Sequence, residues 1–229
     1  MAGSGFGTNF RITTWGETHG AGVGVVVDGC PAGLPLERED VQKYLDRRKP
    51  GQSKYTTQRK EGDQVEILSG IFEGRTTGTP ISMVVYNKDQ RSKDYSNIKD
   101  IYRPGHADFT FDMKYGFRDY RGGGRSSGRE TIGRVAAGAV AAKVLKELGI
   151  EIKAYAKAIA GIEVSKDHFD FAEMNNNPFN MPDKEAAKLV QEKADQMIKE
   201  MDSIGGIIEC QIKGMPVGIG ETVFDKLDA

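Results

Sequence analysis

Cysteine and histidine are scarce in this sequence. Its 229 residues include two cysteines and three histidines. Cys30 and Cys210 lie far apart and show no metal-ligand spacing, so a reduced, cytosolic protein is the simplest interpretation. The histidines form no His-Glu-x-x-His pair, and the pattern holds no other cluster of metal-binding side chains. We therefore predict no metal site.

Long apolar runs and a strong net charge are also missing. No stretch of about 18 apolar residues exists, which argues against a membrane-spanning helix. Residues Met1–Asn9 are small and polar, unlike a secretory signal peptide. The net charge is −1, which disfavours a generic nucleic-acid binder. Gly20, Gly22 and Gly24 lack the spacing of a dinucleotide-binding loop, and no P-loop motif occurs, so neither nucleotide-binding fold is predicted.

Glycine, in contrast, is abundant, and the strongest local signal is the segment Arg121–Glu130, which reads RGGGRSSGRE. Its glycines free backbone N–H groups, its serines add donors, and its arginines offer paired N–H groups to phosphate or carboxylate. The segment runs into a predicted helix, whose N-terminus favours anions. An exposed Arg-Gly linker is the alternative, but it does not explain the apolar helix that follows without a break. We predict an anion-binding loop.

Two histidines and a second basic group could complete such a site. His19 and His106 each lie in a glycine-containing loop beside charged residues. Histidine titrates near neutrality, so both are candidates for proton transfer, with a structural or surface role as the alternative. The basic group spans Arg47–Lys54, with Arg59 and Lys60 beyond it. It either binds anions or forms the solvated end of a helix.

The hydrophobic pattern predicts a mixture of strands and helices. Alternating apolar residues indicate strands, and apolar residues three or four positions apart indicate helices. We expect strands at Phe10–Trp15, Val23–Val27, Val65–Ser69, Ile71–Phe72, Ile81–Tyr86, Ile150–Ile162 and Ile208–Ile212, and helices at Glu37–Arg48, Thr131–Leu148 and Asp183–Ser203. Runs of strands followed by helices indicate an α+β fold with antiparallel pairing.

Four regions carry further expectations. Residues 71–86 are interpreted as a β-meander. The segment Asn87–Tyr120 shows no regular pattern, although its aromatic residues favour an ordered loop. The helix from Thr131 is so rich in glycine and alanine that we expect it to be buried in the middle of the protein. The last residues, Val217–Ala229, open what looks like a new element, which suggests a chain truncated at its C-terminus.

Several segments, occurring in a fixed order, resemble the chorismate synthase family. They are Gly16–Gly20, Pro31–Pro35, Gly70–Pro80, Arg103–Asp108 and Arg121–Arg134. The resemblance extends from Phe6 to the last residues of the chain, and family members are normally considerably longer. It implies a β-α-β sandwich, in which a helical core lies between two antiparallel sheets, and a homotetramer. Residues 1–229 would then form a single domain that lacks its C-terminal part.

The resemblance also implies a reaction. Members of the family are lyases that convert 5-enolpyruvylshikimate 3-phosphate to chorismate and phosphate. This is the last step of the shikimate pathway in aromatic amino-acid biosynthesis. This 1,4-elimination needs reduced FMN, with NADPH as a possible reductant. The flavin lends electron density transiently, so there is no net redox change. Two carboxylates and two phosphates would share one pocket, which fits an arginine-rich site because buried, unpaired anions are prohibitively costly.

Residue roles follow from the same resemblance. His106 resembles the histidine that protonates reduced flavin near N1, and His19 the one that assists the departing phosphate. Positions matching cofactor contacts are Arg125, Ser126, Ser127, Arg48 and Lys54, and positions matching substrate contacts are Arg48, Arg103, Arg129 and Thr18. The family often has arginine, serine and alanine where this chain has Lys54, Thr18 and Gly128.

Two other functions stay open at this point. The Arg-Gly loop could belong to a module that binds phosphoanions or RNA, or the chain could be a flavin oxidoreductase that acts on another substrate. The enzyme interpretation expects a small-molecule partner, without nucleic acid or membrane. It also expects the 229 residues alone to hold a partial site and to be inactive.

Overall fold

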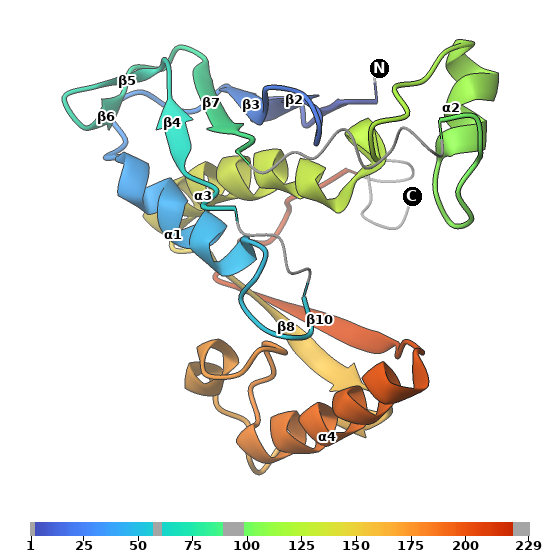
Figure 1. The fold of residues 1–229 in the computed structure, drawn as a ribbon. Helices are drawn as coiled ribbons and strands as arrows, with labels where there is room; N and C mark the ends of the chain where they lie inside the picture. Colours follow the sequence, from blue (N-terminus) through green and yellow to red (C-terminus); the bar gives the residue numbers. More distant parts are fainter. Residues whose placement is uncertain (1–2, 57–60, 89–98, 222–229) are drawn as a thin grey trace. The chain divides into compact units, whose positions relative to one another are not determined.

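The computed structural model describes residues 3–56, 61–88 and 99–221 of the chain (Figure 1). The chain divides into two compact units, Met1–Val144 and Leu145–Ala229. Helices occur together with antiparallel strands, which confirms the predicted α+β class. That residues 1–229 form a single domain stays a prediction. Within the described ranges, no helix is both long enough and apolar enough to cross a lipid bilayer.

The first unit contains a five-stranded antiparallel sheet. Its strands, in spatial order, are β1 (Gly5–Phe6), β2 (Arg11–Gly16), β3 (Gly22–Asp28), β7 (Ile81–Tyr86) and β4 (Val65–Ile67). The central strands β3 and β7 are buried along most of their length, which suits their content of valine and isoleucine. The predicted strands at Phe10–Trp15, Val23–Val27 and Ile81–Tyr86 are confirmed to within a residue or two.

The predicted β-meander over residues 71–86 is wrong. The short strands β5 (Ile71–Phe72) and β6 (Arg75–Thr76) pair with each other, and Arg75 also bridges to Pro35, whereas β7 pairs with β3 and β4. Both edges of β7 are thus occupied, by β3 and by β4. The two-residue strands are left to form a hairpin outside the main sheet.

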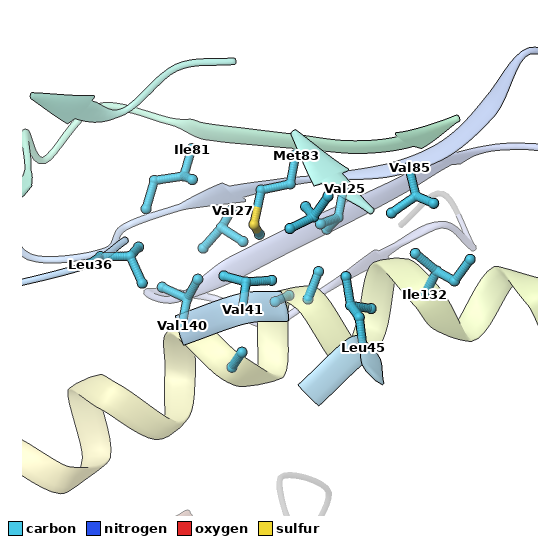
Figure 2. Close-up of a cluster of buried hydrophobic side chains, with 14 of the residues drawn as sticks. Val25, Val27, Leu36, Val41, Leu45, Ile81, Met83, Val85, Ile132 and Val140 are labelled. Atoms are coloured by element: carbon cyan, nitrogen blue, oxygen red, sulfur yellow. The ribbon is translucent and has the colours of Figure 1, made fainter. Parts of the chain in front are cut away.

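The core of this unit lies between the sheet and two helices, α1 (Arg38–Arg48) and α3 (Thr131–Glu147). Both helices confirm the prediction, and a capping box formed by Glu37 and Asp40 fixes the start of α1. Figure 2 shows how the side chains from the strands meet those of the helices. They are Val25, Val27, Ile81, Met83 and Val85 from the strands, Val41 and Leu45 from α1, and Ile132 and Val140 from α3.

Helix α3 approaches the sheet very closely. A Cβ atom at Gly133 would lie 3.0 Å from the carbonyl oxygen of Gly24 and 3.0 Å from the side chain of Thr14. Only a residue without a side chain fits this contact without displacing a neighbour. Arg134 and Gly138, on the other side of the helix, are exposed. The expected burial of α3 is therefore confirmed for one face only.

The segment predicted to be irregular contains a helix, α2 (Asp108–Tyr115), which Gly116 ends in the left-handed conformation at φ 71°. The prediction for Asn87–Tyr120 is therefore wrong at these eight residues. Tyr102 and Phe109 stack edge to face with ring centroids 5.5 Å apart, in accord with the order expected of the aromatic residues. Tyr95 lies outside the described residues.

The second unit contains a three-stranded antiparallel sheet and one long helix. The strands β8 (Glu151–Ile159) and β9 (Ile162–Glu163) form a hairpin, and β10 (Gly206–Lys213) pairs with the other edge of β8. The predicted strand Ile150–Ile162 is thus interrupted by a turn at Ala160 and Gly161, both at positive φ. Helix α4 (Lys184–Glu200) confirms the predicted helix, with Asp183 as its N-cap.

Apolar residues of the second unit are less covered than the pattern suggests. A small core of Ala156, Met181, Ala186, Ala187 and Val190 lies under α4. Leu189 and Ile198 of α4, and Met201 directly after it, are exposed. Residues 217–221 form turns and coil, and the rest of the expected new element lies outside the described residues.

Candidate active site

The predicted anion-binding loop folds as two consecutive 3-10 turns that lead into α3. They are η2 (Gly124–Ser126) and η3 (Gly128–Glu130). The Oγ of Ser127 accepts a hydrogen bond from the backbone N of Arg129, and this caps the second turn. Gly122 and Gly124 have φ of 106° and 51°, a region that favours glycine. The loop is a folded helix entrance, which excludes the alternative of an exposed linker.

His19 lies directly against this loop. A Cβ atom at Gly122 would be 2.5 Å from Cδ2 and 2.8 Å from Nε2 of the His19 ring, so this glycine makes room for the imidazole. His19 and Thr18 are both buried, and the Thr18 hydroxyl donates to the carbonyl of Gly124 at 3.5 Å. The loop and the Gly16–Gly20 segment are therefore packed on each other.

Arg125 turns back into the protein. Its guanidinium donates to the carbonyl of Gly16 at 3.1 Å and to the hydroxyl of Thr14 at 2.7 Å, and it pairs with Glu130 at 3.4 Å. These bonds attach the loop to the end of strand β2. Ser126 is exposed, and its hydroxyl donates to the carbonyl of Gly123 at 2.6 Å.

Arg103 attaches a third segment to the loop. Its guanidinium donates to both carboxylate oxygens of Asp108 at 2.8 Å and to the carbonyl of Gly122 at 3.1 Å. Hydrogen bonds from Arg103 lower the pKa of Asp108 to about 2, so the pair is ionised at neutral pH. His106, between these two residues, is exposed, with its Nδ1 3.0 Å from the carbonyl oxygen of Pro104.

Arg48 and Arg129 meet at one carboxylate. Nη1 of each arginine donates to Asp63 at 2.8 Å, and the Asp63 side chain is completely buried. Arg48 also donates to Thr131 and to the carbonyl of Gly128, at 3.1 and 3.3 Å. Its side chain is only 20% exposed. The alternative interpretation, in which this basic group is a solvated helix end, therefore does not hold for Arg48.

The space beside the loop is small. A cavity of about 50 Å³ is lined by Glu17, Asp108, Asp119 and the glycines from Gly122 to Gly124. Hydrogen bonds from Arg121 lower the pKa of Asp119, and the charge of His19 contributes to the same shift. A larger groove of about 480 Å³ lies at the start of α1 and is lined by none of the predicted site residues.

A sequence profile described as chorismate synthase matches residues 10–229 of this chain. The chain belongs to the chorismate synthase family. It is 69% identical to a chorismate synthase of Lachnospira eligens over 229 residues, which cover all of this chain and 63% of that protein. The chorismate synthase of Agathobacter rectalis is 62% identical, again over the whole chain and 62% of that protein.

A solved structure supports the same assignment. A crystal structure of a chorismate synthase matches with a TM-score of 0.73 and 30% sequence identity, covering 93% of this chain and 61% of that one. The chain thus spans a little over three fifths of the length of the chorismate synthases that it matches.

The structure gathers most of the residues that the family resemblance singled out. Residues that belong to the loop or contact it are Thr18, His19, Arg48, Arg103, Arg125, Ser126, Ser127 and Arg129. Lys54 places its Nζ 5.2 Å from the centroid of the neighbouring Tyr55 ring. Arg59 and Lys60 lie outside the described residues, and no cluster suited to a metal ion occurs within the described ones.

Sequence reasoning did not identify Asp63 or Asn87 as parts of this site. Asn87 accepts a hydrogen bond from Nε of Arg129 at 2.8 Å and donates to the carbonyls of Glu17 and Gly20 at 2.9 and 2.8 Å. Asp63 and Asn87 are 66 and 42 residues away from Arg129 along the chain. No local pattern marks either of them, so only the fold reveals these contacts.

Proposed function

We propose that this chain supplies the part of a chorismate synthase site that is centred on residues 121–130. The proposed activity is that of a lyase: the 1,4-elimination of phosphate from 5-enolpyruvylshikimate 3-phosphate, giving chorismate, with reduced FMN. One observation carries the proposal above the others. The arginine-rich loop is packed against His19 and bonded to Arg48 and Arg103, although these residues lie far apart in the sequence.

The donors at the loop suit the phosphate of FMN. Ser126 is exposed, Gly123 and Gly124 carry backbone N–H groups, and the helix entrance favours negative charge. Ser126, Ser127 and Arg125 would hold the cofactor, with Arg48 and Lys54 beside it, and the bound flavin would supply electron density. The 50 Å³ cavity is far smaller than the roughly 300–1,000 Å³ of typical ligand sites. The described residues therefore fit the anionic part of the cofactor and not its ring system.

The two histidines differ in a way that suits two roles. His19 is buried against Gly122, where exclusion of water would favour transfer of a proton to the departing phosphate. His106 is exposed in a loop that Arg103 and Asp108 hold in place, and it would hold a proton near the flavin. Arg48, Arg103, Arg129 and the Thr18 hydroxyl would bind and orient the substrate.

We also propose the arrangement and assembly of the family for the whole protein: a helical core between two antiparallel sheets, four subunits and a cytoplasmic location, with NADPH as a possible reductant. The exposed face of α3 at Arg134 and Gly138 supports the sandwich, because a core helix needs a second covered face. The small loop cavity supports the expectation that the 229 residues alone bind ligand weakly and do not turn over.

The test uses a chimera in which this chain replaces the matching 63% of the Lachnospira eligens protein. We expect the chimera to form chorismate with reduced FMN, and FMN fluorescence to report tighter flavin binding when 5-enolpyruvylshikimate 3-phosphate is present. The 229-residue chain should form no chorismate. Steady-state turnover by that chain would contradict the partial-site proposal.

The same titrations separate the rival functions. An RNA- or phosphoanion-binding module would bind RNA with an affinity that falls steeply with salt and would ignore the substrate. A flavin oxidoreductase with another substrate would bind FMN, but 5-enolpyruvylshikimate 3-phosphate would leave that affinity unchanged. Either result in the chimera, together with an absence of chorismate, would overturn the proposed function.

A further inference from the structure

Asp63 divides its carboxylate between two arginines. Its Oδ1 accepts from Nη1 of Arg129 and its Oδ2 from Nη1 of Arg48, both at 2.8 Å. The side chain is completely buried, and its backbone has a positive φ of 42°. Two guanidinium groups this close would repel each other without the carboxylate between them. A single group therefore fixes where both arginines point.

Asn87 extends this arrangement to the other side of Arg129. Its Oδ1 accepts from Nε of Arg129, and its Nδ2 donates to the carbonyl oxygens of Glu17 and Gly20. These carbonyls flank His19 along the chain, and the backbone N of Asn87 donates to the next carbonyl, that of Ala21, at 3.0 Å. The amide thus joins the histidine loop to the arginine pair.

Arg129 keeps some of its hydrogen-bonding capacity in this network. Its Nη2 makes no hydrogen bond within the described residues and lies 3.7 Å from Oε2 of Glu61. Arg48 donates from its Nη2 only at 3.3 Å, to the carbonyl of Gly128. The contacts with Asp63 therefore fix the direction of both side chains without using all of their N–H groups.

We propose that Asp63 and Asn87 are positioning residues of this site. Asp63 sets the direction of Arg48 and Arg129, through which it acts on binding of the phosphorylated substrate. Asn87 sets the position of the His19 loop, through which it acts on the proton-transfer step. This inference rests on the proposed function. It predicts that the two residues affect different kinetic constants.

Two simpler explanations give other results. If the cluster only stabilises the fold, changing Asp63 lowers the fraction of active enzyme and leaves KM unchanged. If Asp63 only neutralises part of the positive charge of the arginines, Asp63→Asn leaves more positive charge in the pocket. An anionic substrate should then bind more tightly. Positioning predicts the opposite sign, because two misdirected guanidinium groups bind an anion less well.

The experiment compares three variants of the chimera. Asp63→Asn keeps the shape and removes the charge, and Asn87→Asp keeps an acceptor for Arg129 but loses the donor to the two carbonyls. Glu39→Gln, at a side chain that is 74% exposed, is the control with the same change of charge as Asp63→Asn. We expect Asp63→Asn to raise the substrate KM about 10–100-fold, by analogy with the losses seen when the hydrogen-bond partners of metal ligands are changed, with kcat within about 3-fold.

The other two variants test the role of Asn87 and provide the charge control. Asn87→Asp should lower kcat by about 10–100-fold, as expected for a displaced catalytic group, while the negative charge that it adds beside Arg129 raises KM only modestly. Glu39→Gln should change neither constant. An unchanged or lower KM in Asp63→Asn would overturn the role of Asp63, and an unchanged kcat in Asn87→Asp would overturn that of Asn87. If Asp63→Asn does not fold, Asp63→Glu, which keeps the charge but moves the carboxylate, takes its place with the same expected rise in KM, and an unchanged KM overturns the role of Asp63.

A measurement without turnover separates this proposal from the proposed function. In the 229-residue chain, NMR can follow exchange of the Nη1–H protons of Arg48 and Arg129, which donate to Asp63, with backbone amides of β3 as the control for global unfolding. We expect Asp63→Asn to speed exchange of both Nη1–H groups by about 10-fold or more relative to β3. Unchanged exchange rates would contradict the positioning role of Asp63, even if the chimera is active. An inactive chimera with the expected exchange would instead count against the proposed function.

Discussion

Gly122 is the single residue on which the contact between the loop and His19 depends most directly. Its φ of 106° is unfavourable for any residue with a side chain, and a Cβ atom would lie 2.5 Å from the imidazole. We predict that Gly122→Ala lowers the free energy of unfolding by roughly 2–4 kcal/mol, the sum of backbone strain and overpacking. Urea unfolding followed by the fluorescence of Trp15 measures the change.

Gly105→Ala is the matched control. Gly105 also has a positive φ, 69°, but a Cβ atom there would meet nothing within 4 Å. In this variant the free energy of unfolding should fall only by the cost of backbone strain, about 1–2 kcal/mol. Equal losses in the two variants would show that the His19 ring moves away easily and that the loop does not hold it.

At the residue scale, the sequence predicts which charged side chains gather at the loop, but it does not predict where they point. Arg125 and Arg103 were singled out for ligand binding, and both donate to protein oxygens at 3.2 Å or less. Composition shows that arginines cluster in the loop, whereas their partners are set by contacts across up to 121 residues. Asp63 and Asn87 escaped notice for the same reason.

At the scale of elements, α2 depends on an ion pair for its start. Its N-cap, Ala107, offers no side-chain hydrogen bond, and Asp108, its first residue, is held by Arg103. The pKa of Asp108 is about 2, below its ordinary value of 3.8, and hydrogen bonds from Arg103 are the largest cause. Ionised Asp108 therefore stabilises the folded state above about pH 4, and this contribution is lost as the pH falls toward 2.

We predict that Asp108→Asn lowers stability at pH 7 by on the order of 1–2 kcal/mol and flattens the pH dependence between pH 4 and 2. Asp40 and Glu209 also have pKa values of about 2, but they remain in both proteins and cancel in the difference. Urea unfolding of the two proteins at pH 7, 4 and 2.5 provides the comparison. If the free energy of unfolding changes with pH equally in the two proteins over this range, the prediction is contradicted.

The elements also show where periodicity stops being informative. The hydrophobic pattern does not predict helix α2, because the helix buries only Asp108 and therefore has no apolar stripe at helical spacing. Strand β10 was found, but the alternation of Ile208, Cys210 and Ile212 does not mark a covered face. All three are exposed, while Glu209 on the other face accepts a hydrogen bond from Tyr155. A period of two identifies a strand without telling which face another layer covers.

At the scale of the whole molecule, the two compact units differ in how much apolar surface they bury. Seventeen residues form the buried cluster of the first unit, most of them valine, leucine and isoleucine. The cluster of the second unit has five, of which Ala156, Ala186 and Ala187 are small. Ile207 and Ile208 of its strand β10 are exposed. Because burial of large apolar side chains dominates stability, the second unit should be the weaker one.

We therefore predict that residues 145–221 unfold at a lower urea concentration than the first unit. Trp15, the one tryptophan, reports on the first unit, and hydrogen exchange of peptides from α4 and β10, read by mass spectrometry, reports on the second. Val190→Ala should lower only the second midpoint and Val41→Ala only the first, each through a loss of roughly 1–3 kcal/mol. If both variants shift both midpoints together, the chain unfolds as one cooperative domain, as the sequence predicted.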